Sequence, residues 1–506
     1  MIGAVGYKVI TLNRNQKELY PTMNTFSKKS LHVALAGLST LGLAGAAEAV
    51  MINPNGLGQV LVFPYYTVRN GFNVGDVSTA PFNTLLSIVN TTNSTKAVKV
   101  RFREGKASLE VLDFNVFLSP HDVWTAAVEP DGASGAQIET DDNSCTIPKF
   151  VKGVPVAFRT SEYTQAGTTD PIGGGRERLS EGYFEVFEMA TYDVNDVIST
   201  DSLHSTLGVP SCVGVTDANA SVAPLPPNGG LSGESTLINV LTGDAFTQDA
   251  TAFTQFTTAG TYSDTGVDTP NFGSAIPSNA GAVNGSGQII AGTFSSAALA
   301  STAAMQRTHV INEYVVEKTT ASGTDWVLTF PTKHLLVDTG GAISPFQRRL
   351  TKTGSCDDIS LALYNREESN SAPNPSNPDF SPLPPTNTPL TPALCWEANV
   401  ITFNNTNVLG SANFLSVATR LVPTVDNAGW MDVSFRVGAT NLATGPVGFD
   451  PTTLLPITPT TTFSGLPTVG FAVQTFVNGT LTDSTGKLIQ SSYGGNFGHR
   501  YVGPQP

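Results

Sequence analysis

The feature that most constrains the fold is a series of short strand-like segments, separated by turn-forming residues, between positions 84 and 128. Residues 84–89 are mainly apolar, residues 97–103 alternate between apolar and basic side chains, and residues 109–118 place alternate apolar side chains on one face. Strands of this length at short, regular spacing are typical of an antiparallel β-sandwich. The sequence therefore predicts an all-β fold built from immunoglobulin-like sandwich domains.

The composition agrees with a chain built from strands rather than helices. Only 13% of the 506 residues are charged, whereas about a quarter are charged in an average soluble domain, and the chain contains 48 glycines and 33 prolines. These values exclude a coiled coil or a helical bundle, and the 40% of hydrophobic residues suffice to bury cores. With a net charge of −14, the chain lacks the basic surface that binds phosphate backbones, so nucleic acid is not an expected partner.

The N-terminal segment has the order of a secretory signal. A pair of lysines precedes an apolar stretch at 31–46, and Ala-Glu-Ala at 47–49 supplies the small residues of a cleavage site. We predict a signal peptide over residues 1–49, with Met23 as the more conventional start. The apolar stretch is shorter than the roughly 20 residues that span a membrane, and no transmembrane segment is predicted in the mature chain. We expect export to the cell surface or the extracellular space, with the periplasm as the alternative.

The cysteines fit an oxidising compartment. The four cysteines are Cys145, Cys212, Cys356 and Cys395. None belongs to a Cys-x-x-Cys pair, so disulfides are expected rather than a zinc or redox site. Of the three connectivities that four cysteines allow, sequential pairing is favoured, because each pair then brackets a loop-rich segment within one candidate domain. The second pair encloses eight prolines between 373 and 392, a segment that cannot form a strand ladder or a helix.

Strand character and composition divide the mature chain into three parts. Residues 179–306 contain no Lys or Arg, and from residue 213 the chain is rich in Ser, Thr, Gly and Ala, with a short helix expected at 297–305. We predict an N-terminal sandwich over 50–212, a low-complexity connector or insertion over 213–305, and a C-terminal sandwich over 306–506 with a Pro-rich loop at 370–394. The alternative is a single larger sandwich whose halves pair across the middle segment.

No constellation of residues specifies a reaction. After the leader, five histidines remain, and no two of them have the spacing of a metal-binding pair, so each is interpreted as a surface or turn residue. His121 and Asp122 follow the end of a strand. A turn at this position explains the pair more simply than a catalytic role in activating a nucleophile. No Gly-x-Ser-x-Gly motif occurs.

Three glutamates lie in one strand segment, Glu181, Glu185 and Glu188. In a strand, Glu185 and Glu188 point to opposite faces, which disfavours a pair of glycosidase carboxylates. Glu185 shares a face with Tyr183 and Phe187, so we expect it to be partly buried and to need a basic partner.

Several loops are rich in carboxylates. The candidate calcium ligands are Asp141, Asp142, Asp193, Asp196, Asp357 and Asp358. Calcium takes six or more oxygen ligands, and none of these loops has the spacing of the regular calcium-binding loop. Solvated turns are therefore favoured over a calcium site, and no other cofactor is expected.

Lys99, Arg101 and Arg103 form one cationic stripe on an otherwise acidic chain. They are candidate binding residues for an acidic glycan or for the acidic face of another copy. The favoured interpretation is the solvent-exposed side of a half-buried strand, whose charges also protect a sheet edge.

Several segments resemble a family of exported proteobacterial proteins that are usually labelled hypothetical or cell-surface proteins. The segments are 58–67, 98–105, 118–126, 324–333, Cys395-Trp396-Glu397 and Gly465-Leu466-Pro467. The resemblance spans most of the mature chain and implies a surface or extracellular location. It implies no activity for particular residues.

We therefore expect an exported structural or adhesive protein without catalytic activity, which contacts a surface glycan, a protein or a second copy of itself. One alternative is a secreted hydrolase acting on a glycan or an ester, and another is a periplasmic binding protein. A pocket that places Glu185 or His121 within hydrogen-bond reach of a second titratable group would favour the enzyme.

Overall fold

The computed structural model describes residues 49–71, 80–276, 278–287, 289–367, 370–371, 392–419, 427–435, 440–442, 462–482, 484–485 and 488–503. The predicted signal peptide, apart from residue 49, and most of the predicted Pro-rich loop lie outside these ranges.

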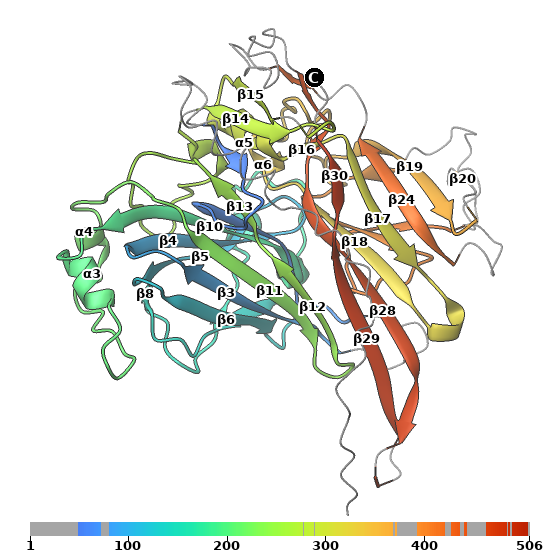
Figure 1. Ribbon diagram of the computed structural model, residues 1–506, viewed down its shortest axis with the longest axis horizontal. Coiled ribbons are helices and arrows are strands. Elements are labelled where there is room, and N and C mark those ends of the chain that lie inside the picture. Colours follow the sequence, from blue (N-terminus) through green and yellow to red (C-terminus); the bar gives the residue numbers. More distant parts are fainter. Residues whose placement is uncertain are drawn as a thin grey trace, which may run out of the picture. The chain divides into compact units, whose positions relative to one another are not determined.

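The described chain is all-β, as predicted, and its strands form four main sheets, named A to D here (Figure 1). Sheet A has the order β1 (Met51–Ile52), β13 (Thr251–Thr254), β2 (Val60–Thr67), β10 (Glu181–Tyr192), β4 (Thr95–Glu104), β5 (Glu110–Leu118) and β8 (Cys145–Ile147). Sheet B has the order β12 (Asp244–Asp249), β11 (Leu231–Asn239), β3 (Asn83–Asn90), β6 (Val123–Pro130), β7 (Ala136–Glu139) and β9 (Val156–Ala157). The paired strands in both sheets are antiparallel.

The C-terminal part forms the other two main sheets. Sheet C has the order β20 (Asn370–Ser371), β19 (Asp357–Asn365), β24 (Ala428–Phe435), β17 (His309–Val315) and β30 (Arg500–Val502), with β21 (Ala393–Leu394) paired to β19. Sheet D has the order β23 (Phe414–Val417), β22 (Ala398–Phe403), β18 (Gly323–Thr329), β28 (Val469–Thr482) and β29 (Leu488–Gly498). The β22–β23 pair is parallel.

Short elements connect the sheets. The small antiparallel pairs are β14 (Asn279–Val283) with β15 (Ile289–Thr293), β16 (Gln306–Arg307) with β27 (Leu466–Pro467), and β25 (Thr440–Leu442) with β26 (Thr462–Ser464). The helices are α2 (Ser161–Thr164), α3 (Val197–Ser202), α4 (Asp217–Ala220), α5 (Ala297–Met305) and α6 (Lys333–Leu336), with short 3₁₀ turns at Arg176–Ser180, Phe272–Ser274 and Lys318–Thr320. Helix α5 confirms the predicted helix. No helix in the described ranges has the length and apolar character needed to cross a membrane.

Each pair of sheets encloses an apolar core. Between sheets A and B, β4 contributes Val100 and Phe102, and β6 contributes the fully buried Trp124. Trp326 of β18 and Val433 of β24 belong to the corresponding core between sheets C and D. Because alternate residues of a strand point to one face, each sandwich follows from the apolar alternation of its strands.

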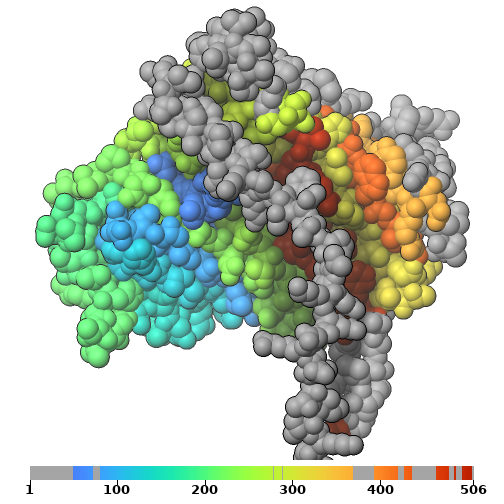
Figure 2. Space-filling view, viewed as in Figure 1, coloured from blue at the N-terminus to red at the C-terminus, as the bar shows by residue number. Residues whose placement is uncertain are grey.

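The two sandwiches also share a buried apolar contact within one compact unit, Glu48–Pro506. Tyr65 of β2 and Phe246 of β12 pack in the same cluster as Val327 of β18 and Phe471 of β28. Strands β12 and β29 run side by side at this contact, where Asn496 donates a hydrogen bond to the backbone oxygen of Thr247 (Figure 1). In Figure 2 a green surface borders the red surface of the C-terminal residues.

The segment predicted as a connector or insertion, 213–305, supplies strands to both N-terminal sheets. It contains β11 and β12 of sheet B and β13 of sheet A. Strand β11 pairs with β3 along its length, from Leu231 opposite Asn90 to Ile238 opposite Asn83. Residues beyond the predicted boundary at 212 thus complete the N-terminal sandwich.

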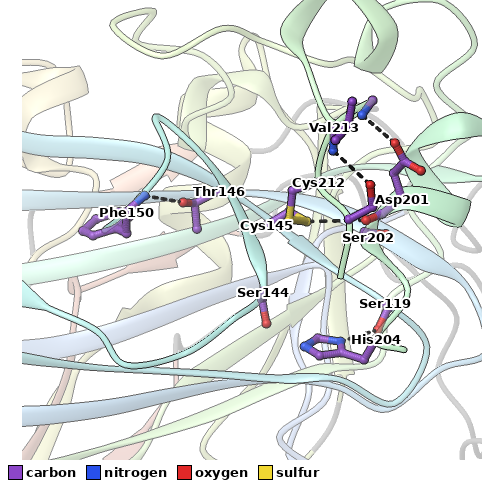
Figure 3. The surroundings of a disulfide bond; sticks show 12 residues. Ser119, Ser144, Cys145, Thr146, Phe150, Asp201, Ser202, His204, Cys212 and Val213 are labelled. Carbon is purple, nitrogen blue, oxygen red and sulfur yellow. Dashed lines mark hydrogen bonds between the residues drawn. A yellow bond between two sulfur atoms is a disulfide. The ribbon is translucent and has the colours of Figure 1, made fainter. Parts of the chain in front are cut away.

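The two disulfides confirm the predicted sequential pairing, Cys145 with Cys212 and Cys356 with Cys395. The first joins β8 to the loop that follows α3 (Figure 3). The second joins the residue before β19 to the residue after β21.

Candidate binding face

The outer face of sheet B is open to solvent. Strand β3 buries Leu86 and Ile88 toward sheet A and turns Leu85 and Ser87 outward, and the side chain of Leu85 is 42% exposed. Strands β6 and β12 show the same alternation of buried and exposed residues. These outward side chains are exposed or half-exposed, so they are available to a partner.

Register aligns the outward side chains of sheet B in rows. Ser87 of β3 lies opposite Glu234 of β11 on one side and Thr125 of β6 on the other. In the adjacent row, Leu85 lies opposite Thr236, and the Thr236 hydroxyl bonds to that of Thr247 at 2.8 Å. We call this surface the acidic face; its carboxylates are Glu129, Glu139, Asp141, Glu234 and Asp249, and its hydroxyls are Ser87, Thr125, Thr236 and Thr247.

A groove with a volume of about 550 Å³ follows the acidic face. Strands β3, β6, β7 and β11 line it, and four of its carboxylates, Glu129, Glu139, Asp141 and Glu234, lie on its wall. No described residue with a positive charge lines this groove. In the described part of the chain, these four carboxylates form no ion pair and accept no hydrogen bond. The groove therefore presents a negative field and free hydrogen-bond acceptors to whatever approaches it.

Two glutamates of the acidic face lie near each other, and glycoside hydrolysis uses a pair of carboxylates. Glu139 lies opposite Ala127, and Glu129 lies opposite Gln137, so the two glutamates are diagonal neighbours with Cα atoms roughly 7–8 Å apart. Glycoside hydrolysis also requires one carboxyl kept protonated by an apolar environment. Both glutamates border an open, hydroxyl-lined groove.

The predicted basic partner of Glu185 is confirmed. Glu185 is fully buried, and its Oε2 lies 3.0 Å from Nε of Arg103. Glu188 pairs separately with Lys96, at 2.5 Å. Burial raises the pKa of both glutamates, and the paired cation opposes this shift in each case. These carboxylates hold the strands of sheet A together and do not reach the groove of sheet B.

The predicted exposure of the Lys99, Arg101 and Arg103 stripe is wrong. All three side chains are buried, because the chain around residues 264–270 lies over this side of sheet A. Each cation meets an acidic partner: Lys99 with Asp113, Arg101 with Glu110, and Arg103 with Glu185. Arg101 and Lys99 also donate to the backbone oxygen of Val267. The stripe thus binds a segment of its own chain.

A serine, a histidine and an aspartate meet beside the first disulfide. Ser119 Oγ lies 3.3 Å from Nδ1 of His204, and Asp122 Oδ2 lies 3.7 Å from the same nitrogen (Figure 3 shows Ser119 and His204). In a catalytic triad the nucleophile and the acid contact opposite ring nitrogens. Because both oxygens here face Nδ1, the cluster does not have the geometry of a triad.

The histidines divide into exposed and buried ones. His121 occupies a turn with φ of 60°, and its Nε2 bonds to Oδ1 of Asn93 at 2.7 Å, in agreement with the turn interpretation. The surface interpretation is wrong for His334 and His499, whose rings are buried, and burial lowers both pKa values, to about 4 for His499. His499 contacts Asn312 and the backbone oxygen of Val327. Packing between sheets C and D explains His499, whereas the ring nitrogens of His334 are buried near the cations Arg101 and Arg103 of sheet A.

Five of the six candidate calcium ligands have structural partners. Asp142 accepts from the backbone of Thr125 and Ser144, Asp193 closes a turn with Asn195, Asp196 caps α3, Asp357 pairs with Lys333, and Asp358 pairs with Arg348. Asp141 belongs to the acidic face. Across the described residues, no group of three or more His, Cys, Asp or Glu side chains is arranged to hold a metal ion.

The sequence did not single out the acidic face. The sequence pattern that could have indicated this face is the combination of outward polar residues on β3 and β6 with a middle segment that has no Lys or Arg. A second exposed feature lies on sheet C, where Trp430 stacks on Tyr364 with ring centroids 4.1 Å apart and remains 38% exposed.

The comparisons with protein-family models, curated proteins and solved structures find no match to this chain.

Proposed function

We propose that this chain is an exported protein of the cell surface or the extracellular space, which acts by contact and not by catalysis. Two disulfides support this proposal, because such bonds persist in oxidising compartments. The resemblance to exported surface proteins, carried by segments such as 58–67 and 118–126, supports the same location.

The acidic face is the proposed contact surface, and its proposed partner is a protein surface rich in Lys and Arg. The observation that carries this proposal is an open sheet face whose carboxylates have no cationic partner in the described chain, although the buried glutamates of sheet A all have partners. A cationic partner supplies the missing charges, and the threonine hydroxyls add hydrogen bonds. A second copy of this acidic chain would meet the face with like charge.

Binding to immobilised poly-L-lysine tests this proposal. The triple variant Glu129→Gln, Glu139→Gln, Glu234→Gln removes three charges from the face without changing its shape. The matched control removes three exposed charges elsewhere: Glu162→Gln, Asp264→Asn and Glu367→Gln. We expect the face variant to bind at least ~10-fold more weakly than the control, which corresponds to about 1.4 kcal/mol. The difference should shrink as salt is raised, because exposed charges are screened.

Equal loss in the two triple variants would contradict the proposal, because binding would then follow net charge alone. Trp430→Ala provides a second control on sheet C. If this single change weakens binding while the face variant does not, the contact surface lies at the aromatic pair and the acidic face is not the site.

Export is tested independently by N-terminal sequencing of the mature chain from fractionated cells. We expect Val50 as the first residue, and digestion of the chain by protease added to intact cells. An uncleaved chain with reduced cysteines in the cytosol would contradict the proposed location.

A further inference from the structure

A buried cluster of one amine and two carboxyl groups lies beside the second disulfide. Lys333 begins α6, Asp357 begins β19, and Glu397 follows β21 by three positions. The disulfide places the two acids, because Asp357 directly follows Cys356 and Glu397 lies two residues after Cys395. Asp357 also pairs with Leu394 in the β19–β21 ladder. The bridge therefore brings both carboxyl groups into the surroundings of Lys333.

All three side chains are removed from water. Lys333 is 1% exposed, Asp357 5% and Glu397 3%. The Lys333 nitrogen lies 5.5 Å from the ring centre of Phe330 and 5.3 Å from that of Phe346. A charged amine and two carboxylates in an aromatic, nearly dry site carry a large desolvation cost unless each charge is fully paired and hydrogen-bonded.

The pairing in this cluster is incomplete. Lys333 Nζ lies 3.3 Å from Oδ2 of Asp357 and donates its hydrogen bond to the backbone oxygen of Ser355. Oδ2 of Asp357 and Oε2 of Glu397 are both buried, and neither accepts a well-formed hydrogen bond from a described residue. An ordinary buried ion pair satisfies its oxygens, whereas here one oxygen of each carboxyl group has no hydrogen bond from a described residue, and Asp357 alone of the two acids lies within ion-pair distance of the Lys333 amine.

The surroundings also favour the neutral form of both acids. Burial raises the pKa of Asp357, and it raises that of Glu397 to about 8. The ammonium of Lys333 is the charge that most opposes the shift in each acid. An amine can attack the carbonyl carbon of a protonated carboxyl group. A carboxyl group whose pKa lies near neutrality also exchanges protons readily.

We propose that Lys333 and Asp357 condense to form an intramolecular amide bond. The Lys333 nitrogen attacks the side-chain carbonyl carbon of Asp357, the new C–N bond forms, and one carboxyl C–O bond breaks. The ammonium and the carboxylate together contain the atoms of the amide and of one water molecule, so no oxidant, reductant or cofactor is consumed. Reacting groups held at contact distance in a water-poor site gain a large effective concentration over free groups.

Glu397 is assigned the proton transfer in this step. In its carboxylate form it takes a proton from the ammonium of Lys333, which frees the nitrogen lone pair, and it gives this proton to the departing oxygen of Asp357. After the attack it takes a second proton from the nitrogen and gives it to the same oxygen, which leaves as water. Glu397 ends in the state in which it began. The product replaces a poorly paired buried charge pair with a neutral amide and links α6 to β19 covalently.

The intact mass of the full chain, produced with its disulfides formed and then reduced and denatured, tests the proposal. We expect the chain to be lighter by one water molecule than its sequence requires. Trypsin should fail to cut after Lys333, and a branched peptide should join Lys333 to Asp357. Asp131-Gly132 is a second place where a chain loses water, by ring closure, so the peptide map must locate the loss.

Two variants define the chemistry. Asp357→Asn offers an amide in place of the acid, so its condensation product should be lighter by one ammonia rather than one water. Glu397→Gln keeps both reacting groups and removes the proton transfer, and we expect the full, uncondensed mass; Glu367→Gln on the surface is its matched control.

A wild-type chain at its full sequence mass overturns the proposal, and so does water loss that maps to any other position. This outcome does not depend on whether a variant folds. A Glu397→Gln chain that condenses to the same extent as the wild type overturns the role assigned to Glu397.

Discussion

Replacing Arg103 by methionine tests how the outer face of sheet A is closed. Arg103 is 3% exposed, and its guanidinium donates to Glu185 Oε2 at 3.0 Å, to the backbone oxygen of Ser108 at 2.8 Å and to Asp268 Oδ1 at 2.9 Å. Methionine fills a similar length of the site and offers no charge. The change leaves the fully buried Glu185 without its cation.

The expected cost follows from these contacts. Breaking a buried ion pair by removing one partner costs about 3–5 kcal/mol, because the remaining charge stays desolvated. Asp268 contributes little to this cost, since its side chain is 61% exposed and returns to water. We therefore expect Arg103→Met to lower the free energy of unfolding by about 4 kcal/mol.

A double-mutant cycle in urea, followed by tryptophan fluorescence on the oxidised chain, separates pairing from packing. The double variant Arg103→Met, Glu185→Met removes both charges, and we expect it to be more stable than Arg103→Met alone. Arg500→Met is the matched control, because its pair with Glu313 is exposed and should be worth about 0–1 kcal/mol. A loss below about 1 kcal/mol for Arg103→Met, or strictly additive effects of the two changes, would refute the reasoning.

Two further predictions concern the C-terminal sandwich and the first disulfide. Because burial raises the pKa of Glu397 from 4.5 to about 8, its contribution to stability is fully present below pH 4.5 and is lost as the pH rises through 8. Glu397→Gln should flatten this part of the stability profile measured by urea unfolding, and an unchanged slope would contradict the assignment. Amide formation would remove the opposing ammonium and leave the direction of this shift unchanged. Replacing both Cys145 and Cys212 by serine opens a loop with a sequence separation of 67, so the midpoint of urea unfolding should fall by the equivalent of about 4 kcal/mol; a change within error would mean that the bridge does not restrain the unfolded chain.

Local patterns were sufficient to predict the strands. Apolar alternation at 97–103 and the turn formers on either side correspond to β4, Thr95–Glu104, and the same holds for β3 and β5. The disulfide pairing was also predictable, because each bridge lies within one sandwich. The strands depend on residues that are near in sequence. The cysteines of each bridge are 67 and 39 residues apart, so their pairing was predicted from the domain division and not from local pattern.

The features missed by the sequence depend on distant pairing. The acidic face exists only because β11 pairs with β3, and β3 with β6, in registers that align Glu234, Ser87 and Thr125. A shift of one residue in either pair would turn the outward set inward. A single sequence does not determine which strands pair. It therefore offers no basis for grouping the glutamates at 129, 139 and 234.

The outer face of sheet A is covered by its own chain, whereas that of sheet B is open. The residues of β10 help to explain this difference. In sheet A, the cations of β4 lie opposite Tyr183, Glu185 and Phe187 of β10, so the face mixes charge with large aromatic area. Aromatic side chains bury roughly 150–250 Å² each. Covering such a face is therefore favourable once its charges are paired. The outer face of sheet B offers mainly hydroxyls, carboxylates and Leu85, which water already solvates. A sheet face that gains little from its own chain stays open, and an open face without cations is suited to a partner that supplies them.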